Sequence, residues 1–434
     1  MTAIQFKLNG RRVDYAGAPS DRLLDVLREQ YGCTSVKCGC KEGECGACSV
    51  LIDGVLYNSC CVAMGAVDRC DVVTMEGFRN TERFQVLERA FGEVSAVQCG
   101  FCIPGMVLAA EALLSHNPHP TEEEIREGLS GNLCRCTGYN AIVKAVQAAA
   151  EAGTGLWDAP YKNLEPVVPV TLAEALSLRK NTTLVPYAGG TDLMVENRPG
   201  ADYLFLHRVE ELRRITEDES YIRIGAAVTF TEAIESPLVP ELMKEALRRI
   251  AAPAIRNAGT FGGNLCNGSA KADSVLIAFA AGAKLRLLSQ DAERIVKVED
   301  FYLGRKKLDL REDELIAELL LPKTGLEHYY YQKVGGRNAL AISRVSFAGV
   351  FAQEGGRITN VAAAFGAVAD TVLRYPDLEA RLIGRTIEEA KAVKEDHLKA
   401  YADRMALTRG RVSAEYRKRV CMNLLSDFLS FYGI

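Results

Sequence analysis

The chain has 434 residues, of which 48% are hydrophobic and 25% charged, and its formal net charge is −4. These proportions are ordinary for a soluble globular protein, and the small negative charge gives no electrostatic reason to expect nucleic acid or an anionic membrane as a partner. No stretch approaches the run of about 18 apolar residues that a membrane-spanning helix needs. The length predicts about three domains.

Cysteine is the residue type that is most unevenly placed. Twelve of the fourteen cysteines lie in the first 136 residues. The N-terminal stretch MTAIQFKLNGRRVDY alternates like a β-strand rather than resembling a signal peptide. Many cysteines in such a chain indicate metal ligation in a reducing compartment. We therefore expect a cytoplasmic protein whose metal chemistry is confined to its first third.

Residues 1–77 predict a small α+β domain. Asn9-Gly10 is a strong signal for a two-residue hairpin turn. Ser20 can cap a helix that ends near Tyr31, because the apolar residues between them recur on one helical face. Strands are expected at 3–8, 11–15, 47–52, 55–58 and 71–75.

The densest motif of the chain is KCGCKEGECGACSVLIDGVLYNSC at residues 37–60. Read from Cys40, its thiols follow C-x4-C-x2-C, with a fourth at Cys60, which is the plant-type spacing for a 2Fe–2S cluster. Four thiolates must converge on a small iron–sulfide core, and the glycines between them let the loop curl around it. The predicted ligands are Cys40, Cys45, Cys48 and Cys60.

Additional cysteines lie next to this motif, so the choice of its four ligands needs separate evidence. A start at Cys38 would put six residues before Cys45, which does not fit the spacing. Cys61 rivals Cys60, although adjacent strand residues point to opposite faces and only one of the two should serve. A zinc site usually uses two separated cysteine pairs, and a disulfide framework does not suit a long chain without a signal peptide. The thiols interpreted as buried or spare are Cys33, Cys38, Cys61 and Cys70.

Residues 78–152 predict an all-helical second domain. Four helices are expected: around 84–91, from Pro104 to Leu114, after the capping box Thr121-x-x-Glu124, and around 142–149. A C-x2-C pair lies just before the second helix and a C-x-C pair just before the fourth. Helix N-termini offer free N–H groups and positive dipole ends, which stabilise an anionic cluster. Spacing alone leaves zinc open for these four thiols, which are Cys99, Cys102, Cys134 and Cys136.

Two glycine-rich segments follow a Pro-rich stretch at 153–169 that we interpret as a linker. AGGTD at 188–192 comes directly after a predicted strand, and GTFGGN occupies 259–264. Successive N–H groups in such loops form anion-binding concavities, so the pair suits a dinucleotide pyrophosphate, although each loop alone is also compatible with a sharp turn. The chain has no G-x-G-x-x-G, so a Rossmann nucleotide site is unsupported.

The remainder predicts strands and then two helices. Strand-like segments lie at 329–334, 345–351 and 358–365, and the last helix should run from Ser413 to Tyr432. His116 and His119 lie among prolines and are interpreted as loop residues. Neither a G-x-S-x-G elbow nor an H-E-x-x-H motif is present, so the sequence offers no basis for hydrolytic chemistry.

Taken together, these motifs resemble the xanthine dehydrogenase/molybdenum hydroxylase family over the whole length of the chain. The cysteine loop resembles the first iron–sulfur domain of the family, and the family register favours Cys60 over Cys61. VQCGFCIPGM (97–106) with GNLCRCTGY (131–139) resembles the second, all-helical one. This pairing implies a second 2Fe–2S cluster rather than zinc on Cys99, Cys102, Cys134 and Cys136.

The flavin domain of the family is resembled by AGGTD (188–192) and TFGGN (260–264), and SAEYRKRV (413–420) resembles part of its C-terminal region. The segment LCNGSAKA (265–272) departs from the family pattern, since Ala270 stands where proline is common. The resemblance implies FAD, bound without a covalent link. The implied FAD contacts are Tyr187, Ala188, Gly189, Gly190, Thr191, Asp192, Thr260, Gly262, Gly263, Asn264, Asp273, Lys333 and Arg344.

The implied fold class is α+β and multidomain. It comprises a plant-type ferredoxin-like β-grasp domain, a four-helix 2Fe–2S domain, a two-subdomain α/β FAD-binding domain, and a C-terminal antiparallel sheet with helices. The expected boundaries are 1–77, 78–152, a linker at 153–169, 170–328 and 329–434.

The resemblance implies an electron-transfer subunit, because the molybdopterin region of the family has no counterpart in the sequence. The partner is then a molybdopterin-binding large subunit that oxidises a purine, another heterocycle or an aldehyde, and no catalytic residue is expected in this chain. Electrons would pass through the helical-domain cluster, the plant-type cluster and FAD to NAD or another acceptor. Gln98 and Cys136 should face the partner, and a dimer of heteromers is expected.

The sequence also bears on three other interpretations. Relatives that reduce benzoyl-CoA derivatives insert a third cluster in the flavin domain, but only Cys266 and Cys421 follow Cys136 here. A self-contained NAD(P)H-dependent iron–sulfur flavoprotein reductase remains an alternative, although no separate nucleotide domain is visible. The two glycine-rich loops argue against a non-enzymatic metal-binding or assembly protein.

Overall fold

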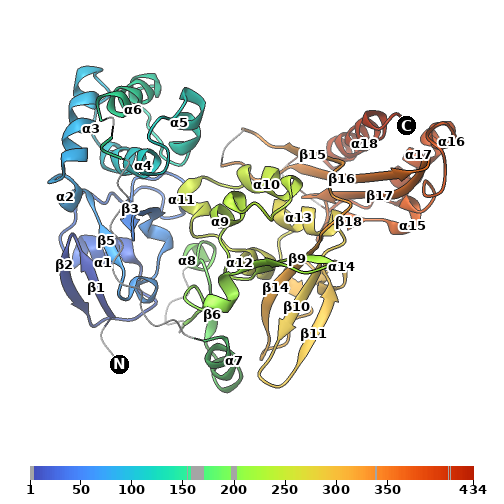
Figure 1. Ribbon diagram of the computed structural model, residues 1–434, viewed down its shortest axis with the longest axis horizontal. Helices are drawn as coiled ribbons and strands as arrows, with labels where there is room; N and C mark the ends of the chain where they lie inside the picture. Colours follow the sequence, from blue (N-terminus) through green and yellow to red (C-terminus); the bar gives the residue numbers. More distant parts are fainter. Residues whose placement is uncertain are drawn as a thin grey trace. The chain divides into compact units, whose positions relative to one another are not determined.

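The computed structural model describes residues 4–153, 155–157, 171–196, 203–337, 340–408, 410 and 412–434 (Figure 1). The fold is mixed α/β, and the chain divides into two compact units. The first comprises Met1–Val170, Thr183–Arg208 and Ala251–Gly259; the second comprises Thr171–Thr182, Val209–Ile250 and Thr260–Ile434. The linker predicted for 153–169 lies, apart from 153 and 155–157, outside the described residues.

A five-stranded sheet of order β2-β1-β5-β3-β4 opens the first unit. The predicted hairpin is present, and Asn9 and Gly10 have positive φ of 52° and 80°, as its turn requires. Strand β1 also pairs in parallel with β5. The elements are β1 (Ile4–Leu8), β2 (Arg11–Tyr15), α1 (Leu23–Glu29), β3 (Ser49–Ile52), β4 (Val55–Asn58), the 3-10 turns η1 (Ser59–Cys61) and η2 (Met64–Val67), and β5 (Asp71–Val73).

Helix α1 starts later than predicted, and Ser20 is not its N-cap. Arg22 occupies that position without a side-chain cap. The preceding residues form a turn in which the Ala18 N–H donates to the Asp21 carboxylate at 2.9 Å, and the Tyr15 hydroxyl donates to the same carboxylate. The same turn binds a distant segment, since the Gly65 N–H donates to the Pro19 carbonyl oxygen and the Met64 N–H to the Asp21 carbonyl oxygen, both at 2.8 Å. These contacts keep residues 18–21 out of the helix.

The helices that residues 75–152 form in the first unit pack around one apolar core, to which Leu87, Met106, Ile125 and Val146 contribute. Thr121 forms the predicted capping box with Glu124. The helices are α2 (Met75–Phe78), α3 (Glu82–Glu93), α4 (Ile103–His116), α5 (Glu122–Gly128) and α6 (Asn140–Ala152). The same unit holds β6 (Val185–Tyr187), which pairs in parallel with β7 (Tyr203–Phe205), and the helices α8 (Leu193–Glu196) and α11 (Pro253–Arg256).

The second unit contains an antiparallel sheet of order β11-β10-β14-β9-β8. One face of this sheet is apolar, and α13 is buried along its whole length. The elements are α7 (Leu172–Asn181), η3 (Glu210–Arg213), β8 (Ile215–Glu217), β9 (Tyr221–Gly225), α9 (Phe230–Glu235), α10 (Glu241–Arg248), α12 (Phe261–Cys266), α13 (Asp273–Ala280), β10 (Lys284–Leu288), β11 (Glu293–Lys297), α14 (Val298–Phe301), β12 (Tyr302–Gly304), β13 (Lys307–Leu308) and β14 (Leu315–Pro322).

A second antiparallel sheet, β15-β16-β17-β18, lies between two helical layers (Figure 1). Tyr331 and Ala348 share a core with α13, whereas Phe347 and Phe365 share one with α18, because alternate strand residues point to opposite faces. The elements are β15 (Tyr329–Val334), β16 (Val345–Glu354), β17 (Arg357–Gly366), β18 (Leu373–Arg374), α15 (Pro376–Glu379), α16 (Ile387–Ala392), α17 (Lys394–Arg404) and α18 (Ala414–Phe431).

The C-terminal helix has the predicted bounds, with Ser413 as its N-cap. The expectation of only two helices after the strands was wrong, because α15 and α16 also form there. They are short, at 4 and 6 residues, so each carries little helical periodicity in its sequence. None of the helices in the described ranges combines the length and the apolar character that a membrane crossing requires.

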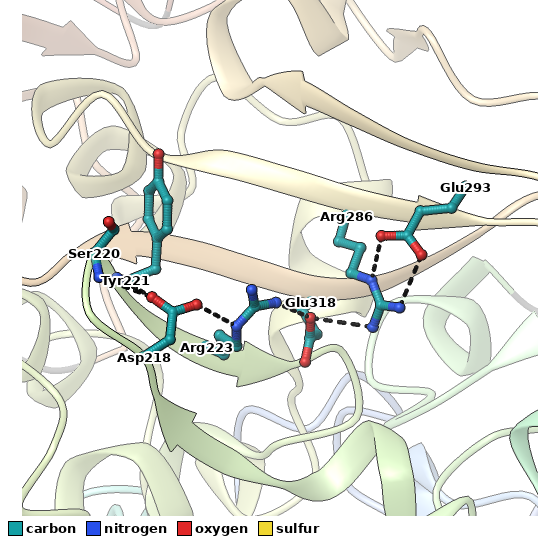
Figure 2. A network of polar contacts seen from close by, with 7 residues as sticks. All are labelled: Asp218, Ser220, Tyr221, Arg223, Arg286, Glu293 and Glu318. Atoms are coloured by element: carbon teal, nitrogen blue, oxygen red, sulfur yellow. Dashed lines mark hydrogen bonds and ion pairs between the residues drawn. The ribbon is translucent and has the colours of Figure 1, made fainter.

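A row of alternating charges crosses the polar face of the five-stranded sheet in the second unit (Figure 2). Glu318 on β14 accepts hydrogen bonds from Arg223 on β9 and Arg286 on β10, at 2.9 and 3.4 Å. At its two ends, Arg223 also binds Asp218 and Arg286 also binds Glu293. These charges fix the register of three neighbouring strands without contributing to the apolar core.

Replacement of Glu318 by alanine should lower the free energy of unfolding of this unit by about 1 kcal/mol. The loss should be small because each arginine keeps a second carboxylate, and 1 M salt should reduce it further. Denaturant unfolding of the variant against the parent protein measures the change. Glu293→Ala, at the more exposed end of the row, is the control and should have less effect; a larger effect would contradict the central role of Glu318.

Candidate functional site

The first cysteine quartet lies in the loop between α1 and β3 and in the turn η1. Cys48 and Cys60 are buried, at 3% and 1% exposure, and Cys40 and Cys45 are half-buried. The thiols act on one another: Cys60 is the largest cause that lowers the pKa of Cys40 and of Cys48, and Cys40 also acts on the pKa of Cys45. The loop therefore brings the four predicted ligands close enough together to shift one another's pKa values.

Backbone N–H groups point at these sulfur atoms. Glu42 and Glu44 donate to Cys40 Sγ at 3.4 and 3.3 Å, and Gly43 donates to Cys60 Sγ at 3.3 Å. Gly43 has a φ of +73°, which lets its N–H turn inward. Hydrogen bonds of this kind stabilise thiolates, so the residues present fit an anionic iron–sulfur cluster.

Hydrogen bonding lowers the pKa of the Cys40 thiol to about 4, with Cys60 as the largest cause and the N–H groups of Glu42 and Glu44 following. Burial acts to raise the pKa of Cys134, but the hydroxyl and N–H of Thr137 lower it to about 7. A thiolate is the form that ligates metal. Hydrogen bonding also lowers the pKa of Cys48 in the first quartet and of Cys99 in the second. Each quartet thus holds two sulfurs that are disposed to lose their protons.

The competing thiols have other surroundings. Cys61 Sγ lies 3.8 Å from Cys60 Sγ, but it is Cys60 that receives the Gly43 N–H. Cys38 is exposed, and Cys33 is buried near the Tyr31 carbonyl oxygen. Cys70 Sγ accepts a hydrogen bond from Arg208 at 3.2 Å. This geometry favours Cys60 as the fourth ligand.

The second quartet lies where two helices begin, as predicted. Cys102 is the N-cap of α4, and Cys134 and Cys136 precede α6. Cys99 Sγ and Cys136 Sγ are 3.6 Å apart and exposed. Cys102 is buried, and this burial, followed by the neighbouring Cys134 thiol, raises its pKa.

Asn132 joins the two cysteine loops and was missed from the sequence. Its side-chain N–H donates to the Gly46 carbonyl oxygen at 3.1 Å, and the Leu133 N–H donates to the Cys45 carbonyl oxygen at 2.9 Å. A Cβ on Gly105 would lie 2.3 Å from the same Gly46 oxygen. The close approach of the two cysteine loops depends on Asn132 and Gly105. Neither residue type ligates an iron–sulfur cluster, so the sequence did not indicate their role.

The first glycine-rich loop, 188–192, follows β6 in the first unit. A Cβ on Gly189 would lie 1.7 Å from the Ala258 carbonyl oxygen. Gly190 has a φ of +69°, and a Cβ there would lie 2.1 Å from the Tyr187 ring. Tyr187 itself is buried at 2% exposure. The loop is therefore shaped by close backbone and ring contacts that only glycine permits.

The second loop belongs to the second unit. Thr260 caps α12 by accepting the Gly263 N–H at 3.2 Å. A Cβ on Gly262 would lie 2.8 Å from the Ala226 oxygen, whereas Gly263 is exposed and its Cβ would meet only the Thr260 hydroxyl, at 3.1 Å. Asn264 accepts a hydrogen bond from Ser274 at 2.7 Å. Gly263 is thus the glycine whose side is open for a ligand.

Asp273 and Lys333 form a buried ion pair in the second unit. Lys333 Nζ lies 2.8 Å from Asp273 Oδ2 and donates to the Arg249 carbonyl oxygen at 2.7 Å. Ser343, which the sequence did not single out, donates to Asp273 Oδ1 at 3.1 Å. Burial raises the pKa of Asp273, and Lys333 acts against that rise. Arg344, by contrast, is exposed.

Comparison with known families divides the chain into four matched segments. They are a 2Fe-2S iron-sulfur cluster binding domain (6–69), a [2Fe-2S] binding domain (74–147), an FAD binding domain in molybdopterin dehydrogenase (162–324) and a CO dehydrogenase flavoprotein C-terminal domain (329–431). The nicotinate dehydrogenase small FeS subunit of Eubacterium barkeri is 50% identical over 148 residues, which cover 34% of this chain and 94% of that protein. The chain belongs to the xanthine dehydrogenase/molybdenum hydroxylase family.

This chain spans about a third of the length of another relative. Xanthine dehydrogenase of Emericella nidulans is 28% identical over an alignment of 482 positions, gaps included, which covers 88% of this chain and 35% of that protein. Among solved structures, a carbon monoxide dehydrogenase from Hydrogenophaga pseudoflava that lacks the Mo-pyranopterin moiety matches with a TM-score of 0.56 and 25% identity. That match covers 61% of this chain and 98% of the other.

Family membership decides the cofactors. The chain is an oxidoreductase subunit with two 2Fe–2S domains and an FAD-binding domain, which removes the zinc alternative for the second quartet. The individual ligands and flavin contacts remain predictions from the residues and their geometry. The two glycine-rich loops belong to different compact units.

Replacement of Lys333 by methionine should destabilise the FAD-free protein by about 3–5 kcal/mol, because it leaves the Asp273 carboxylate buried without its counter-ion. Adding Asp273→Asn in the same chain should recover most of that loss, since no charge is then buried. Denaturant unfolding of the two variants and the parent measures both values. If the double variant is no more stable than Lys333→Met, the ion pair is not the cause.

Proposed function

We propose that this chain is the electron-transfer subunit of a molybdenum hydroxylase. It passes electrons from a molybdenum centre on a partner chain through the helical-domain cluster, the plant-type cluster and FAD to an acceptor such as NAD. The clusters supply one-electron carriers and the flavin a two-electron acceptor. The four matched domains and the relative named as a small FeS subunit support this proposal.

The two quartets differ in exposure, and this difference supports the proposed order in which electrons pass through the two clusters. Cys99 and Cys136 lie at the surface, whereas Cys48 and Cys60 are buried. Three large apolar side chains close to the second quartet in sequence are also exposed, at 45% to 47%: Val97, Phe101 and Leu133. Exposed apolar groups around a functional site indicate a protein interface. We infer that the molybdopterin-binding subunit docks here, beside Gln98.

The finer architecture is part of the same proposal. We assign a plant-type ferredoxin-like β-grasp domain to 1–77, a four-helix 2Fe–2S domain to 78–152, the FAD-binding domain to 170–328 and the C-terminal flavoprotein domain to 329–434. The presence of β6 and its glycine loop in one unit and the five-stranded sheet in the other supports two subdomains for the FAD domain. We also assign a cytoplasmic location, because the thiolates that would hold the two clusters stay reduced in that compartment.

Reconstitution with a molybdopterin-bearing large subunit of this family tests the proposal. The mixture should reduce both clusters and the flavin when substrate is added, whereas the chain alone should transfer electrons from NADH to dyes and hydroxylate nothing. Sedimentation should also show whether a dimer of heteromers forms. Hydroxylation by the chain alone would overturn the assignment. Failure to bind any large subunit, with rapid NADH turnover on a small molecule, would favour the self-contained NAD(P)H-dependent reductase.

A paired variant locates the docking face. Phe101→Asp should abolish substrate-dependent reduction because it places a charge in the apolar interface, and it should leave the NADH–dye reaction unchanged. Phe431→Asp is the matched control, since Phe431 is 67% exposed on the C-terminal helix, far along the chain. Equal losses in the two variants would contradict the proposed face.

A further inference from the structure

The side chain of Tyr187 links the first glycine-rich loop to the segment that follows a predicted cluster ligand. The Ala63 N–H donates to the Tyr187 hydroxyl oxygen across an N–O distance of 3.2 Å. Both residues are buried, at 0% and 2% exposure, and both belong to the first unit. Ala63 is three residues beyond Cys60 in the sequence. A buried N–H without a partner lowers the stability of the folded state, so this hydrogen bond should persist in the folded protein.

A second tie holds the other end of the loop. The Arg22 guanidinium donates to the Met194 carbonyl oxygen at 2.7 Å. Arg22 also pairs with Ala63 as an isolated antiparallel bridge. Residues 188–193 therefore lie between two contacts, one to Ala63 and one to Arg22, and these two residues pair with each other.

The Tyr187 ring also packs against the backbone of the loop. A Cβ on Gly190 would lie 2.1 Å from this ring, so the loop backbone runs directly over it. The rings of Tyr203 and Phe205 pack against Tyr187, with centroids at 5.2 and 5.0 Å. A ligand that fixes the backbone of the loop must also fix the ring and the hydroxyl that Ala63 contacts.

We propose that Tyr187 is a positioning residue that couples FAD binding at the 188–192 loop to the state of the first cluster. FAD on the loop fixes the position of the Tyr187 ring, and the Tyr187 hydroxyl fixes Ala63 through its hydrogen bond. Ala63 in turn restrains the preceding turn η1, which carries Cys60. The coupling is reciprocal, so a cluster on Cys60 equally favours FAD on the loop. This inference rests on the proposed function, because it takes FAD and the first cluster to bind at these two places.

The test compares the FAD-loaded protein with the same protein after reversible removal of FAD. Hydrogen exchange with mass spectrometry follows the peptide that contains Ala63, and EPR follows the two reduced clusters. In the parent protein, removal of FAD should speed exchange in this peptide by about tenfold and shift the EPR signal of one cluster only; about 1.4 kcal/mol of lost protection corresponds to that factor.

Tyr187→Phe keeps the ring but removes the acceptor. The variant should show fast exchange at Ala63 even with FAD bound, weaker FAD binding by about tenfold, and a cluster signal that no longer responds to FAD removal. Tyr31→Phe is the matched control, since its hydroxyl donates to the Asp14 carbonyl oxygen at 3.0 Å elsewhere in the same unit. This control should behave like the parent protein.

Two results would overturn the coupling while leaving the proposed function intact. The first concerns the parent protein with both clusters and FAD bound. If removal of FAD changes neither the exchange at Ala63 nor either EPR signal, the coupling is absent. This measurement does not depend on whether a variant folds. The other is a Tyr187→Phe protein that responds to FAD removal as the parent does. Absence of FAD or of the first cluster from the parent protein would instead defeat the proposed function itself.

Discussion

Replacement of Cys60 by alanine should remove one of the two EPR signals of the reduced protein and about half of its iron. Cys61→Ala, one residue along, should retain both signals. The reason is that the Cys60 thiol receives the Gly43 N–H and lies close enough to Cys40 and Cys48 to shift their pKa values. Removal of one ligand leaves three thiolates around a cluster that needs four. Iron analysis and low-temperature EPR measure the outcome.

The start of the motif is tested in the same way. Cys40→Ala should lose the same signal as Cys60→Ala, whereas Cys38→Ala should lose none, because Cys38 is exposed and Cys40 receives two backbone N–H groups. The second cluster should persist in all four variants, and its signal is the internal control. Loss of a signal in Cys38→Ala but not in Cys40→Ala would move the register by two residues. Stoichiometric zinc without any EPR signal would contradict both clusters.

Gly263→Val should abolish FAD binding while leaving the stability of the FAD-free protein nearly unchanged. A Cβ at Gly263 would meet only the Thr260 hydroxyl, at 3.1 Å, so the new side chain would point into the open side of the loop. If the FAD pyrophosphate approaches there, the valine occupies its place. Flavin absorbance after gel filtration and thermal unfolding of the FAD-free protein measure the two effects.

Gly190→Val supplies the contrast. Its side chain would collide with the Tyr187 ring, and its φ of +69° disfavours any side chain. This variant should therefore lose both flavin and stability. Flavin that stays with the polypeptide after acid precipitation of the parent would contradict non-covalent binding. Full flavin content in Gly263→Val would remove the second loop from the site.

Local sequence signals were sufficient wherever the responsible contacts are close along the chain. Asn9-Gly10 specified the first hairpin, and Thr121 with Glu124 specified a helix start through a reciprocal pair of bonds. Ser413 likewise marked the start of the last helix. Spacing also indicated the chemistry of the first cysteine quartet, because three of its thiolates come from one tight loop. For the second quartet, whose two halves lie more than thirty residues apart, spacing left zinc open, and the family resemblance indicated a cluster. The hairpin and the two helix starts depend on interactions within a few residues.

Other features were decided only by residues that are distant in sequence. Ser20 does not cap helix α1, because the residues on either side of it bind a distant segment: the Gly65 N–H donates to the Pro19 carbonyl oxygen and the Met64 N–H to the Asp21 carbonyl oxygen. Ser343 contacts Asp273 across 70 positions, and Ala63 contacts Tyr187 across 124. A serine, an alanine or a tyrosine carries no signal for such a partner, since its preference for one neighbour arises only when folding places a buried donor beside an acceptor. The sequence by itself determined which cofactors the chain can hold, and the tertiary structure decided how their loops are tied together.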